Sequence, residues 1–314
     1  MVKLAAVEAA PVFLNKSATT KKVCDLILEA GSKGADVIGF PECFISGYPG
    51  WHALISPTNP LVQSLSLRLF ESAVEVPGPE VDAISEACKK ANIYAVVGIN
   101  ERRANTTGTL FNTQLIFGRD GTLLHKHQKY IPTVGERLIH APGHTGSKAS
   151  ATTDFGAVSG LICGENGNPL AQYSLGLDYP SVHVASWPHF FSIDHDMSDA
   201  IEVAGKAVAF SVGAFVINSA GLVGDEELEA YGTEGEVRDF LLGERRKRRA
   251  TIYGPGGFVV AGPLEEGSDK EILYADVDLQ VVKAVKFPFD YAGHYQRPAI
   301  FAHHFKTYLD SPEL

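Results

Sequence analysis

The stretch that decides the fold class consists of LAAVEAAPV (4–12), KSATTKKVCDLILEAGSKGA (16–35) and ADVIGFPE (35–42). The first and third segments are short, apolar and rich in β-forming residues, which is typical of buried strands. In the middle segment, apolar residues recur at helical spacing, at Val23, Leu26, Ile27 and Ala30. Glycines follow where such a helix would end. A strand, a helix and a second strand in this order indicate an α/β fold.

The same alternation continues to the C-terminal end of the chain. Strand-like runs lie at 93–102, 157–166, 179–188, 214–221 and 271–278, hairpin-like pairs at 109–129 and 249–263, and helix-like runs at 81–92 and 198–213. Two stretches interrupt this rhythm, at residues 52–72 and 222–248. We therefore predict one continuous domain over residues 1–314 with two insertions, which we expect at the surface.

The composition is that of a globular protein without a membrane or nucleic-acid partner. Hydrophobic residues make up 45% of the 314 residues and the formal net charge is −10, whereas nucleic-acid binders usually carry the opposite sign. No apolar run reaches the roughly 18 residues that a membrane helix needs. Glu8 lies inside the apolar N-terminal stretch, which favours a first strand over a signal peptide. We therefore expect a cytoplasmic protein that acts on a small molecule.

The candidate thiols are those of Cys24, Cys43, Cys88 and Cys163. In a chain of this length without an export signal we expect reduced thiols, and because none lies in a CxxC pair we expect no zinc cluster. Cys163 ends the β-forming run of AVSGLICGEN, and Gly164 follows it. Its thiol could therefore be exposed at a sheet edge, with backbone N–H groups aimed at a developing oxyanion. On the local sequence alone, an inert buried cysteine is the alternative. Cys43, which precedes Phe44 and Ile45, fits a core position better.

Glu42, Lys129 and Glu136 are candidate partners of that thiol. Glu42 closes the apolar run VIGFPE, where desolvation would raise its pKa as a general base requires. A capped strand end or a salt bridge is the alternative. Lys129 follows a strand and, close to Glu42 and Cys163, would stay protonated and stabilise an anionic intermediate. Glu136 with Arg137 is either a second carboxylate of the site or a helix-start ion pair.

Two further clusters carry weaker signals. His125 and His127 alternate on one strand, but no third ligand stands at a useful spacing, so we predict a solvated strand face and no metal site. The basic run Arg245–Arg249 follows an acidic stretch in a chain of net charge −10. We therefore predict an ion network at the surface or at a subunit interface, and no nucleic-acid site.

The order of several motifs resembles that of the nitrilase superfamily. FPE at 40–42, K-x-x-PT-x-x-ER at 129–137 and CGEN at 163–166 are similar to the segments that carry its Glu–Lys–Cys triad. PECFISGYPGW, VEVPGPEVDAI and FNTQLIFGRDGTLLHKHQKYIPTVGER extend the match, and GHYQRPAIF near the C-terminus resembles a motif of the nitrilase branch. The resemblance spans about residues 4–301.

This resemblance implies an αββα four-layer sandwich that pairs into an αββα–αββα dimer or a larger homo-oligomer. It implies that Cys163 is the nucleophile, Glu42 the base and Lys129 the charge stabiliser, with Glu136 holding Lys129. It implies no metal and no organic cofactor, because covalent catalysis supplies the difficult step. By the same matching, the substrate pocket is lined by Tyr48, Trp51 and Trp187.

The sequence departs from the nitrilase pattern beside the nucleophile, where Gly164 and Asn166 replace the usual Trp and His. Gly164 removes bulk there, so we expect a larger or differently angled acyl group to be admitted. The predicted reaction converts an organic nitrile to the carboxylic acid and ammonia through a thioimidate and a thioester on Cys163. The alternatives are an amidase or N-carbamoyl hydrolase with the same triad, an enzyme that stops at the amide, and a non-catalytic scaffold.

Overall fold

The computed structural model describes residues 1–232 and 234–311, in which twelve strands form one mixed sheet. Nine of them follow the order β5-β4-β3-β2-β1-β9-β8-β7-β6, while β12 pairs with β1, β10 with β9, and β11 with β10. The strands are β1 (Val2–Ala9), β2 (Val37–Gly39), β3 (Tyr94–Arg102), β4 (Leu110–Phe117), β5 (Leu123–Gln128), β6 (Ser150–Thr153), β7 (Gly156–Ile162), β8 (Pro180–Trp187), β9 (Phe215–Gly221), β10 (Thr251–Tyr253), β11 (Val259–Ala261) and β12 (Ile272–Val277).

The sheet bends into two halves where β1 meets β9. These strands pair only at Glu8–Ala220 and Ala9–Gly221, so little backbone pairing joins the half with β2 to β5 to the half with β6 to β8. Between the halves lies a cluster of buried side chains drawn from both, including Leu4, Ala6, Val96, Val158, Val184, Ile217 and Ile252. A Cβ atom on Gly39 would lie 2.6 Å from Val184 Cγ1, so only glycine permits this close approach of the halves.

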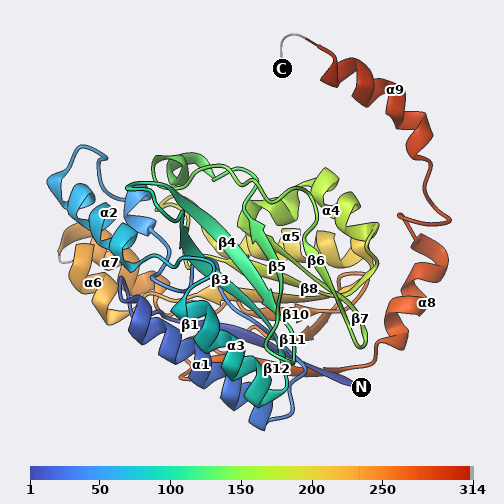
Figure 1. Ribbon diagram of the computed structural model, residues 1–314, viewed down its shortest axis with the longest axis horizontal. Coiled ribbons are helices and arrows are strands. Elements are labelled where there is room, and N and C mark those ends of the chain that lie inside the picture. The colour runs from blue at the N-terminus through green and yellow to red at the C-terminus, as the bar shows by residue number, and fades with distance from the viewer. Residues whose placement is uncertain (233, 312–314) are drawn as a thin grey trace.

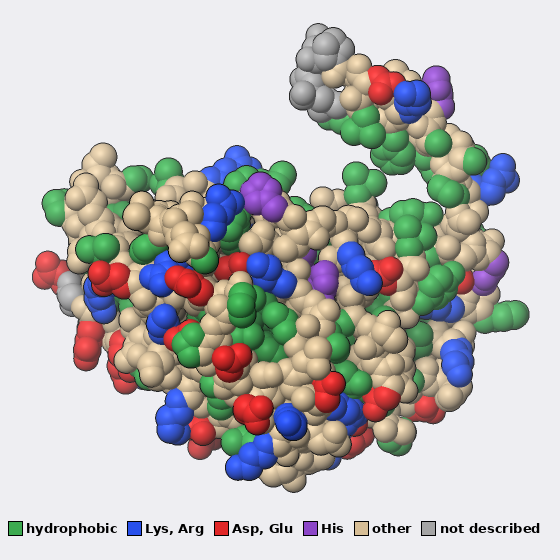
Figure 2. Space-filling view, viewed as in Figure 1, with side chains coloured by type: hydrophobic (Ala, Val, Ile, Leu, Met, Phe, Trp, Pro, Cys, Tyr) green, Lys and Arg blue, Asp and Glu red, His purple; other side chains and the backbone are tan. Residues whose placement is uncertain are grey.

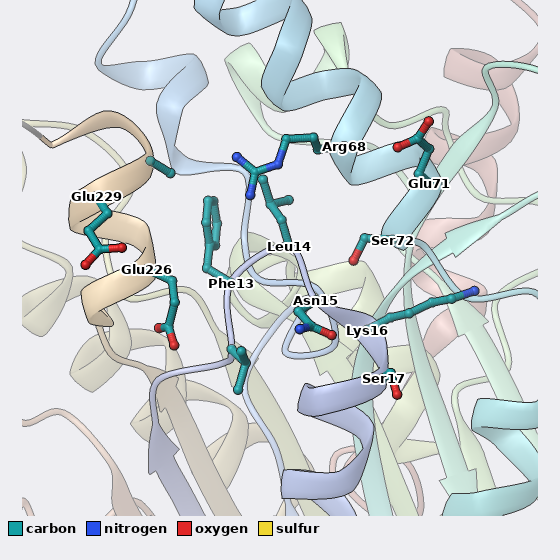
Figure 3. Close-up of a pocket in the computed structure, with 12 residues that line it drawn as sticks. Phe13, Leu14, Asn15, Lys16, Ser17, Arg68, Glu71, Ser72, Glu226 and Glu229 are labelled. Atoms are coloured by element: carbon teal, nitrogen blue, oxygen red, sulfur yellow. The ribbon is translucent and has the colours of Figure 1, made fainter.

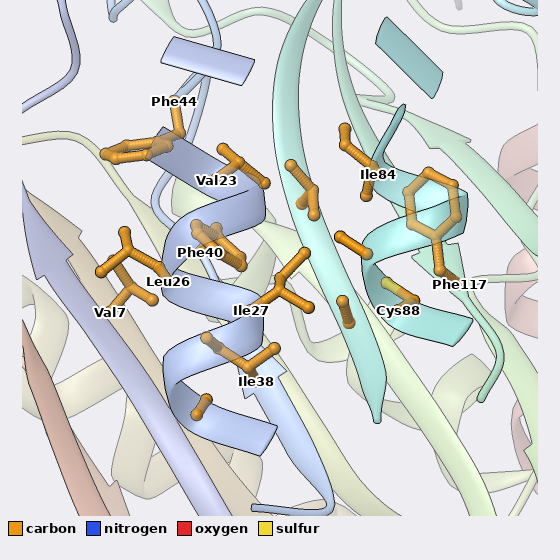
Figure 4. Close-up of a cluster of buried hydrophobic side chains, with 14 of the residues drawn as sticks. Val7, Val23, Leu26, Ile27, Ile38, Phe40, Phe44, Ile84, Cys88 and Phe117 are labelled. Carbon is orange, nitrogen blue, oxygen red and sulfur yellow. The ribbon is translucent and has the colours of Figure 1, made fainter. Parts of the chain in front are cut away.

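Helices cover the outer face of each half (Figure 1). The α-helices are α1 (Lys16–Ser32), α2 (Pro60–Ser72), α3 (Pro79–Ala91), α4 (Pro169–Gly176), α5 (Met197–Val212), α6 (Asp225–Tyr231), α7 (Gly235–Glu244), α8 (Gln280–Phe289) and α9 (Pro298–Leu309). On the first half, the apolar stripes of α1 and α3 pack on the strands through Val23, Leu26, Ile27, Ile84 and Cys88 (Figure 4). On the second half, α4 and α5 do the same through Ala171, Leu175, Ile201, Val208 and Val212. The predicted α/β class is therefore confirmed.

Local capping explains where the longer helices begin and end. The Asn15 side chain accepts a hydrogen bond from Ala18 N at 3.1 Å and starts α1. Asp196 starts α5 by accepting from Ser198 N at 2.8 Å, and Gly213 ends it in the left-handed conformation with φ of 67°. The helical spacing recognised in the sequence thus lies between residues that suit helix termini.

The two interruptions of the rhythm are helical and pack against each other. Residues 52–72 contain α2 and the end of a short 3₁₀ helix, η1 (Gly50–Ala53), while residues 222–248 contain α6 and α7. Buried side chains from both insertions form one cluster, which includes Leu65, Leu69, Leu228, Tyr231 and Leu241. A cavity of about 650 Å³ lies where α2 and α6 meet the start of α1, beside Phe13, Arg68 and Glu226 (Figure 3). This cavity contains no residue of the predicted triad.

The basic run is an ion network, but it is not confined to the surface. Arg246 pairs with Glu266 with both side chains exposed, as predicted. Arg249, by contrast, is 5% exposed, and its guanidinium contacts Glu244 at 2.7 Å and Asp196 at 2.9 Å. The expectation of a purely surface or interface position was wrong for Arg249, because its partner Glu244 is itself buried at the end of α7.

The chain ends in an arm that leaves the body (Figure 1). After β12, helix α8 runs along the body, and α9 projects away from it with every one of its residues exposed. The part of the chain that follows α8 carries exposed apolar side chains at Tyr295, Ile300, Phe301, Phe305 and Tyr308. Among the described residues, no helix is both long and apolar enough to cross a membrane.

Candidate active site

The predicted catalytic residues follow the ends of strands that run in the same direction. Glu42 lies beyond β2, Lys129 directly follows β5, and Cys163 directly follows β7. β2 is parallel to β1 and β3, β7 is parallel to β8, and two antiparallel steps turn β5 back into the direction of β3. The sheet therefore brings all three residues to one edge. Glu42 and Lys129 come from the first half, and Cys163 comes from the second.

Lys129 lies at the centre of a buried ionic network. Its Nζ is 2.8 Å from Glu42 Oε1 and 2.7 Å from Glu136 Oε2, and its side chain is 1% exposed. Asn112 Nδ2 donates to Glu42 Oε1 at 2.6 Å and to Glu136 Oε1 at 2.7 Å. One ammonium and one amide thus hold two carboxylates in place, and the charges of both carboxylates help to raise the pKa of Lys129 well above 10.5 in spite of burial.

The two carboxylates have opposite pKa shifts. Burial, aided by the negative charge of Glu136, raises the pKa of Glu42 to about 7 although Lys129 opposes this. Burial acts on Glu136 as well, but Lys129 and the hydrogen bond from His140 outweigh it and hold the pKa of Glu136 well below 4.5. Glu136 therefore stays anionic, whereas Glu42 can gain and lose a proton near neutral pH, as a general base must.

Glu136 is fixed by its own helix end and by a chain of polar residues. It lies in the 3₁₀ helix η2 (Val134–Leu138), where its carboxylate accepts from Thr133 N at 3.0 Å. His140 Nδ1 is 3.1 Å from Glu136 Oε1, and His140 Nε2 is 2.9 Å from Asn100 Oδ1. Asn100, Asn112 and His140 were not predicted from the sequence. Polar residues inside the otherwise apolar strand runs at 93–102 and 109–117 were the available signal for the two asparagines.

Cys163 occupies a strained position at the start of the 3₁₀ helix η3 (Cys163–Gly167). Its φ is +51°, which is unusual for a residue other than glycine and is typical of functional turns. Burial and the negative charge of Glu42 raise the pKa of the thiol well above 9.0, with Lys129 opposing. The resting thiol is therefore protonated and needs a base. Glu42 Oε2 is buried and has no hydrogen-bond partner among the described residues, so this oxygen is free to accept a proton.

Cys43, the competing thiol, is fully buried as expected of a core residue. Burial raises its pKa well above 9.0, and the charge of the adjacent Glu42 adds to this rise. The charge of Lys129 opposes this rise but does not outweigh it, so the Cys43 thiol stays protonated.

The turn after Cys163 is held by two further polar side chains. Glu165 accepts from Ile162 N at 2.9 Å and from Tyr130 N at 2.6 Å. Asn166 Nδ2 donates to Leu161 O at 3.2 Å and to Cys163 O at 3.0 Å. Both side chains are buried, so the motif CGEN builds the turn as well as supplying the thiol.

The prediction of a solvated strand face was wrong for His127. His127 is 1% exposed, and its Nε2 donates to Glu165 at 2.9 Å, because β5 faces the turn of η3 at that position. His125 is half-buried and contacts Lys148 O at 2.8 Å. Within residues 1–232 and 234–311, no group of three or more His, Cys, Asp or Glu side chains is arranged to hold a metal ion.

The predicted pocket residues lie in different surroundings. Tyr48 is buried, its pKa is raised by burial and by the charges of Glu136 and Glu42, and its hydroxyl contacts His52 Nε2 at 3.2 Å. Trp51 is fully buried, with Phe13 and Tyr231 against its ring.

Trp187 is buried as well, and its indole N–H donates to Asn218 Oδ1 at 2.8 Å. Gly164 is exposed, and a Cβ atom there would meet only Thr133 Oγ1, at 3.8 Å. The chain thus leaves space for a side chain immediately after Cys163. The roles of these four residues in a pocket stay predictions.

Comparison with known sequences identifies relatives over nearly the whole chain. The sequence profile of the carbon–nitrogen hydrolase family matches residues 3–287. A protein named nitrilase from Paraburkholderia phymatum is 35% identical over 303 residues, which cover 96% of this chain and 86% of that protein. An aliphatic nitrilase from Rhodococcus rhodochrous is 32% identical over 314 residues, which cover 99% of this chain and 84% of that protein.

Comparison with solved structures finds the same fold. The carbon–nitrogen hydrolase from Helicobacter pylori G27 superposes with a TM-score of 0.71 at 16% identity, covering 97% of this chain and 98% of that one. Nit3 of Saccharomyces cerevisiae, a member of branch 10 of the nitrilase superfamily, superposes with a TM-score of 0.68 at 17% identity, covering 94% and 97% of the two chains. At these identities the likeness concerns the fold alone.

Proposed function

The chain belongs to the carbon–nitrogen hydrolase family, and on this premise we propose that it is a nitrilase that converts an organic nitrile to the carboxylic acid and ammonia. The observation that carries the proposal is the buried network in which Lys129 lies 2.8 Å from Glu42 and 2.7 Å from Glu136, at the sheet edge that also carries Cys163. This arrangement supplies a nucleophile, a base and a fixed positive charge.

The first half of the reaction forms a covalent intermediate. Glu42 takes the proton of the Cys163 thiol, which otherwise remains protonated because burial raises its pKa. The thiolate adds to the carbon of the C≡N group, and the nitrogen gains a proton to give a thioimidate. Lys129 and the backbone N–H of Gly164 stabilise the negative charge that develops on nitrogen.

The second half releases both products. Glu42 removes a proton from water, which adds to the thioimidate carbon and gives a tetrahedral intermediate. Transfer of a proton to its nitrogen lets ammonia leave, and a thioester on Cys163 remains. A second water then releases the carboxylic acid and restores the thiol. Glu136, whose pKa is held low, stays anionic throughout and keeps Lys129 charged and in place.

The wall around the thiol sets the choice of nitrile. We propose that Tyr48, Trp51 and Trp187 line the pocket and that Gly164 leaves room for a larger or differently angled acyl group. The thiol, the base and the ammonium carry out every step above, so the proposed reaction requires neither a metal ion nor an organic cofactor. Because the thiol must stay reduced, a cytoplasmic location suits the enzyme.

The test is the release of ammonia from a panel of aliphatic, aromatic and arylaceto nitriles and from the matching amides. The wild-type enzyme is expected to hydrolyse nitriles, Cys163→Ala is expected to be inactive, and mass spectrometry of quenched reactions should show an acyl increment on Cys163. Turnover of the amides without turnover of any nitrile would replace the proposal by an amidase. Full activity of Cys163→Ala would refute the covalent mechanism.

We also propose that the enzyme works as a homodimer or a larger homo-oligomer of the αββα–αββα type. The support is the apolar surface of the C-terminal arm, which Figure 2 shows standing away from the body. Leu309 is 73% exposed, Tyr295 60% and Tyr308 58%, which is a large apolar surface for a chain on its own. A second copy of the chain that covers this surface would remove it from water.

A further inference from the structure

The reacting groups are divided between the two halves of the sheet. Lys129 follows β5 of the first half, whereas Cys163 follows β7 of the second half. Little strand pairing joins the halves, since β1 and β9 pair at only two positions, and along the sheet order β1 is the strand of the first half that lies farthest from β5. The packed core between the halves and the hydrogen bond from Glu42 N to Trp187 O hold the halves together, and side chains that connect the two loops directly add to the control of the distance between the thiol and the ammonium.

Glu165 makes that connection. Its Oε1 accepts from Tyr130 N, the residue after Lys129, at 2.6 Å. Its Oε2 accepts from Ile162 N, the residue before Cys163, at 2.9 Å. One carboxylate thus joins the backbone on one side of the lysine to the backbone on one side of the cysteine. The side chain of Glu165 is 5% exposed, so water competes little for these hydrogen bonds.

His127 completes the binding of this carboxylate from the first half. Its Nε2 lies 2.9 Å from Glu165 Oε2, and since a carboxylate only accepts, this nitrogen donates. His127 Nδ1 is buried without a hydrogen-bond partner among the described residues, which fits an imidazole that carries its proton on Nε2. Glu165 therefore receives two donors from the first half, at Tyr130 and His127, and one from the second, at Ile162.

Asn166 holds the same turn without reaching across. Its amide donates to Leu161 O and Cys163 O, and its Oδ1 lies 2.8 Å from Nε2 of His183 on β8. All three of these partners belong to the second half. Asn166 can thus support the strained φ of +51° at Cys163, but it does not connect Cys163 to Lys129.

We propose that Glu165 is a positioning residue that ties the Cys163 turn to the Lys129 loop and thereby decides whether the tetrahedral intermediate yields the acid or the amide. The inference rests on the proposed nitrilase reaction and goes beyond it, because it assigns a role to a carboxylate outside the triad. Glu165 touches neither substrate nor reacting atoms; it acts through the backbone on either side of them.

The reason lies in the two ways in which this intermediate can break down. Its carbon carries the Cys163 sulfur, a hydroxyl and an amino group. If the amino nitrogen takes up a proton and the hydroxyl loses one, the C–N bond breaks and ammonia leaves a thioester. If the C–S bond breaks instead, the sulfur regains a proton and the amide is released. The first route requires the intermediate, bound to Cys163, to be held against the groups around Lys129 that donate and accept its protons.

Removing the tie should therefore favour the second route. In Glu165→Gln, one amide N–H₂ must face either Tyr130 N or the donors at Ile162 and His127, so a donor meets a donor and one connection is lost. We expect kcat to fall by about tenfold or more with little change in KM, because a small misplacement slows the chemical steps. The fraction of amide among the products should rise several-fold.

A pair of substitutions at His127 provides the rescue test. In His127→Gln an amide N–H₂ can donate to Glu165 from nearly the same position as Nε2, whereas His127→Leu removes the donor and leaves one lone pair of the carboxylate unsatisfied. We expect His127→Gln to keep the wild-type ratio of acid to amide and His127→Leu to shift it in the direction of Glu165→Gln. Glu202→Gln, an exposed position on α5, is the matched control and should change nothing.

The experiment measures kcat, KM and the ratio of acid to amide for these variants, together with the rate at which iodoacetamide alkylates Cys163. Circular dichroism identifies variants that fail to fold, in which case the His127 pair decides. A folded Glu165→Gln variant with a wild-type product ratio and kcat would overturn the proposal, and so would equal ratios for the two His127 variants.

The alkylation rate keeps this result separate from the proposed function. If the wild-type enzyme turned over no nitrile, the nitrilase proposal would fail, yet the Cys163 thiol would still report on its surroundings. We expect Glu165→Gln to slow alkylation by about fivefold or more relative to wild type, because the thiol moves away from the groups that activate it. Equal alkylation rates would count against the role of Glu165 whatever the substrate.

Discussion

At the scale of single residues, the site depends on two carboxylates that share one lysine and yet behave differently. Glu42 and Glu136 both lie within 2.8 Å of Lys129 Nζ. Glu136 also receives hydrogen bonds from Thr133 N and lies 3.1 Å from His140, whereas Glu42 has one oxygen without a partner among the described residues. The extra donors help to keep Glu136 charged, and with fewer donors the pKa of Glu42 lies near 7, as the proposed base requires.

The pH dependence of the reaction should report this difference. The pKa of Glu42 is raised from 4.5 to about 7, so the ionised base is lost as the pH falls through 7. We expect kcat/KM to rise with pH up to about 7 and to fall by about tenfold per unit well below it. The measurement is kcat/KM between pH 5 and pH 9 with a nitrile that does not titrate.

A variant can test whether the ionic network around Lys129 causes the fall of kcat/KM at low pH. The negative charge of Glu136 helps to raise the pKa of Glu42, so Glu136→Gln should move the acid limb to lower pH even though its activity is reduced. A wild-type limb centred near 4.5, the ordinary value of a carboxyl group, would contradict the assignment.

Gly164 offers a test of specificity at the residue scale. Because a Cβ atom there meets only Thr133 Oγ1 at 3.8 Å, Gly164→Trp should fold and should place an indole beside the thiol. We expect kcat/KM for bulky aromatic nitriles to fall by about tenfold relative to small aliphatic ones. Gly243→Trp on α7, where a Cβ atom meets nothing within 4 Å, is the control. An unchanged substrate profile in Gly164→Trp would show that the glycine does not shape the pocket.

At the scale of elements, the basic run shows how one sequence pattern can serve two purposes. Arg246 is exposed beside Glu266, whereas Arg249 passes into the interior and contacts Glu244, Asp196 and His189 O. The buried arginine thereby joins the end of α7 to the start of α5 and to the segment after β8. Arg246 forms its ion pair with Glu266, which is itself exposed.

Stability should separate these two arginines. Removing one partner of a buried ion pair leaves the other charge unpaired, so Arg249→Met should lower the free energy of unfolding by about 3 kcal/mol. Arg246→Met removes an exposed pair and should change it by less than about 0.5 kcal/mol. Urea denaturation followed by circular dichroism measures both. Similar losses for the two variants would show that the network around Arg249 contributes little.

Some ends of strands and helices were not predicted from the sequence. The run ADVIGFPE was predicted as one strand, but β2 ends at Gly39 and the next three residues carry Glu42 to the edge. Pro41 has no N–H to continue the strand pairing, and Phe40 O and Gly39 O accept hydrogen bonds from Ser186 and Ser219 of the other half. The helices of residues 222–248 were not predicted, since their buried residues face another insertion and not a sheet.

At the scale of the whole molecule, the C-terminal arm ends in a helix that does not pack against the body. Helix α9 buries none of its residues, although it carries Phe301, Phe305 and Tyr308. Apolar residues at the surface of a projecting helix favour association with another copy over contact with water. The same region contains GHYQRP, so the motif that resembled the nitrilase branch lies in the arm and not at the thiol.

Deleting residues 298–314 should therefore change assembly without unfolding the body. We expect the melting temperature to stay within about 2 °C of wild type, because the deletion removes no buried side chain among the described residues of α9. Sedimentation velocity should show a smaller species than the wild-type oligomer. An unchanged mass would exclude the arm from the interface, and a wild-type monomer would refute the proposed oligomer itself. The double variant Phe301→Asp and Phe305→Asp should act like the deletion.

The sequence by itself determined the α/β class, the placement of Lys129 and Cys163 after strands, and the family, because these depend on local periodicity and on short ordered motifs. It also indicated the direction of the pKa shift of Glu42, since an acidic residue closing an apolar run must be desolvated.

Only the tertiary structure decided what surrounds those residues. Asn112 between the two carboxylates, Glu165 across the two halves, and the burial of His127 and Arg249 all join segments that are distant in sequence. The physical reason is that the sequence does not distinguish a polar side chain at the surface from one in the interior until its partners are known. Burial with a partner turns that side chain into part of the site, and only the fold supplies the partner.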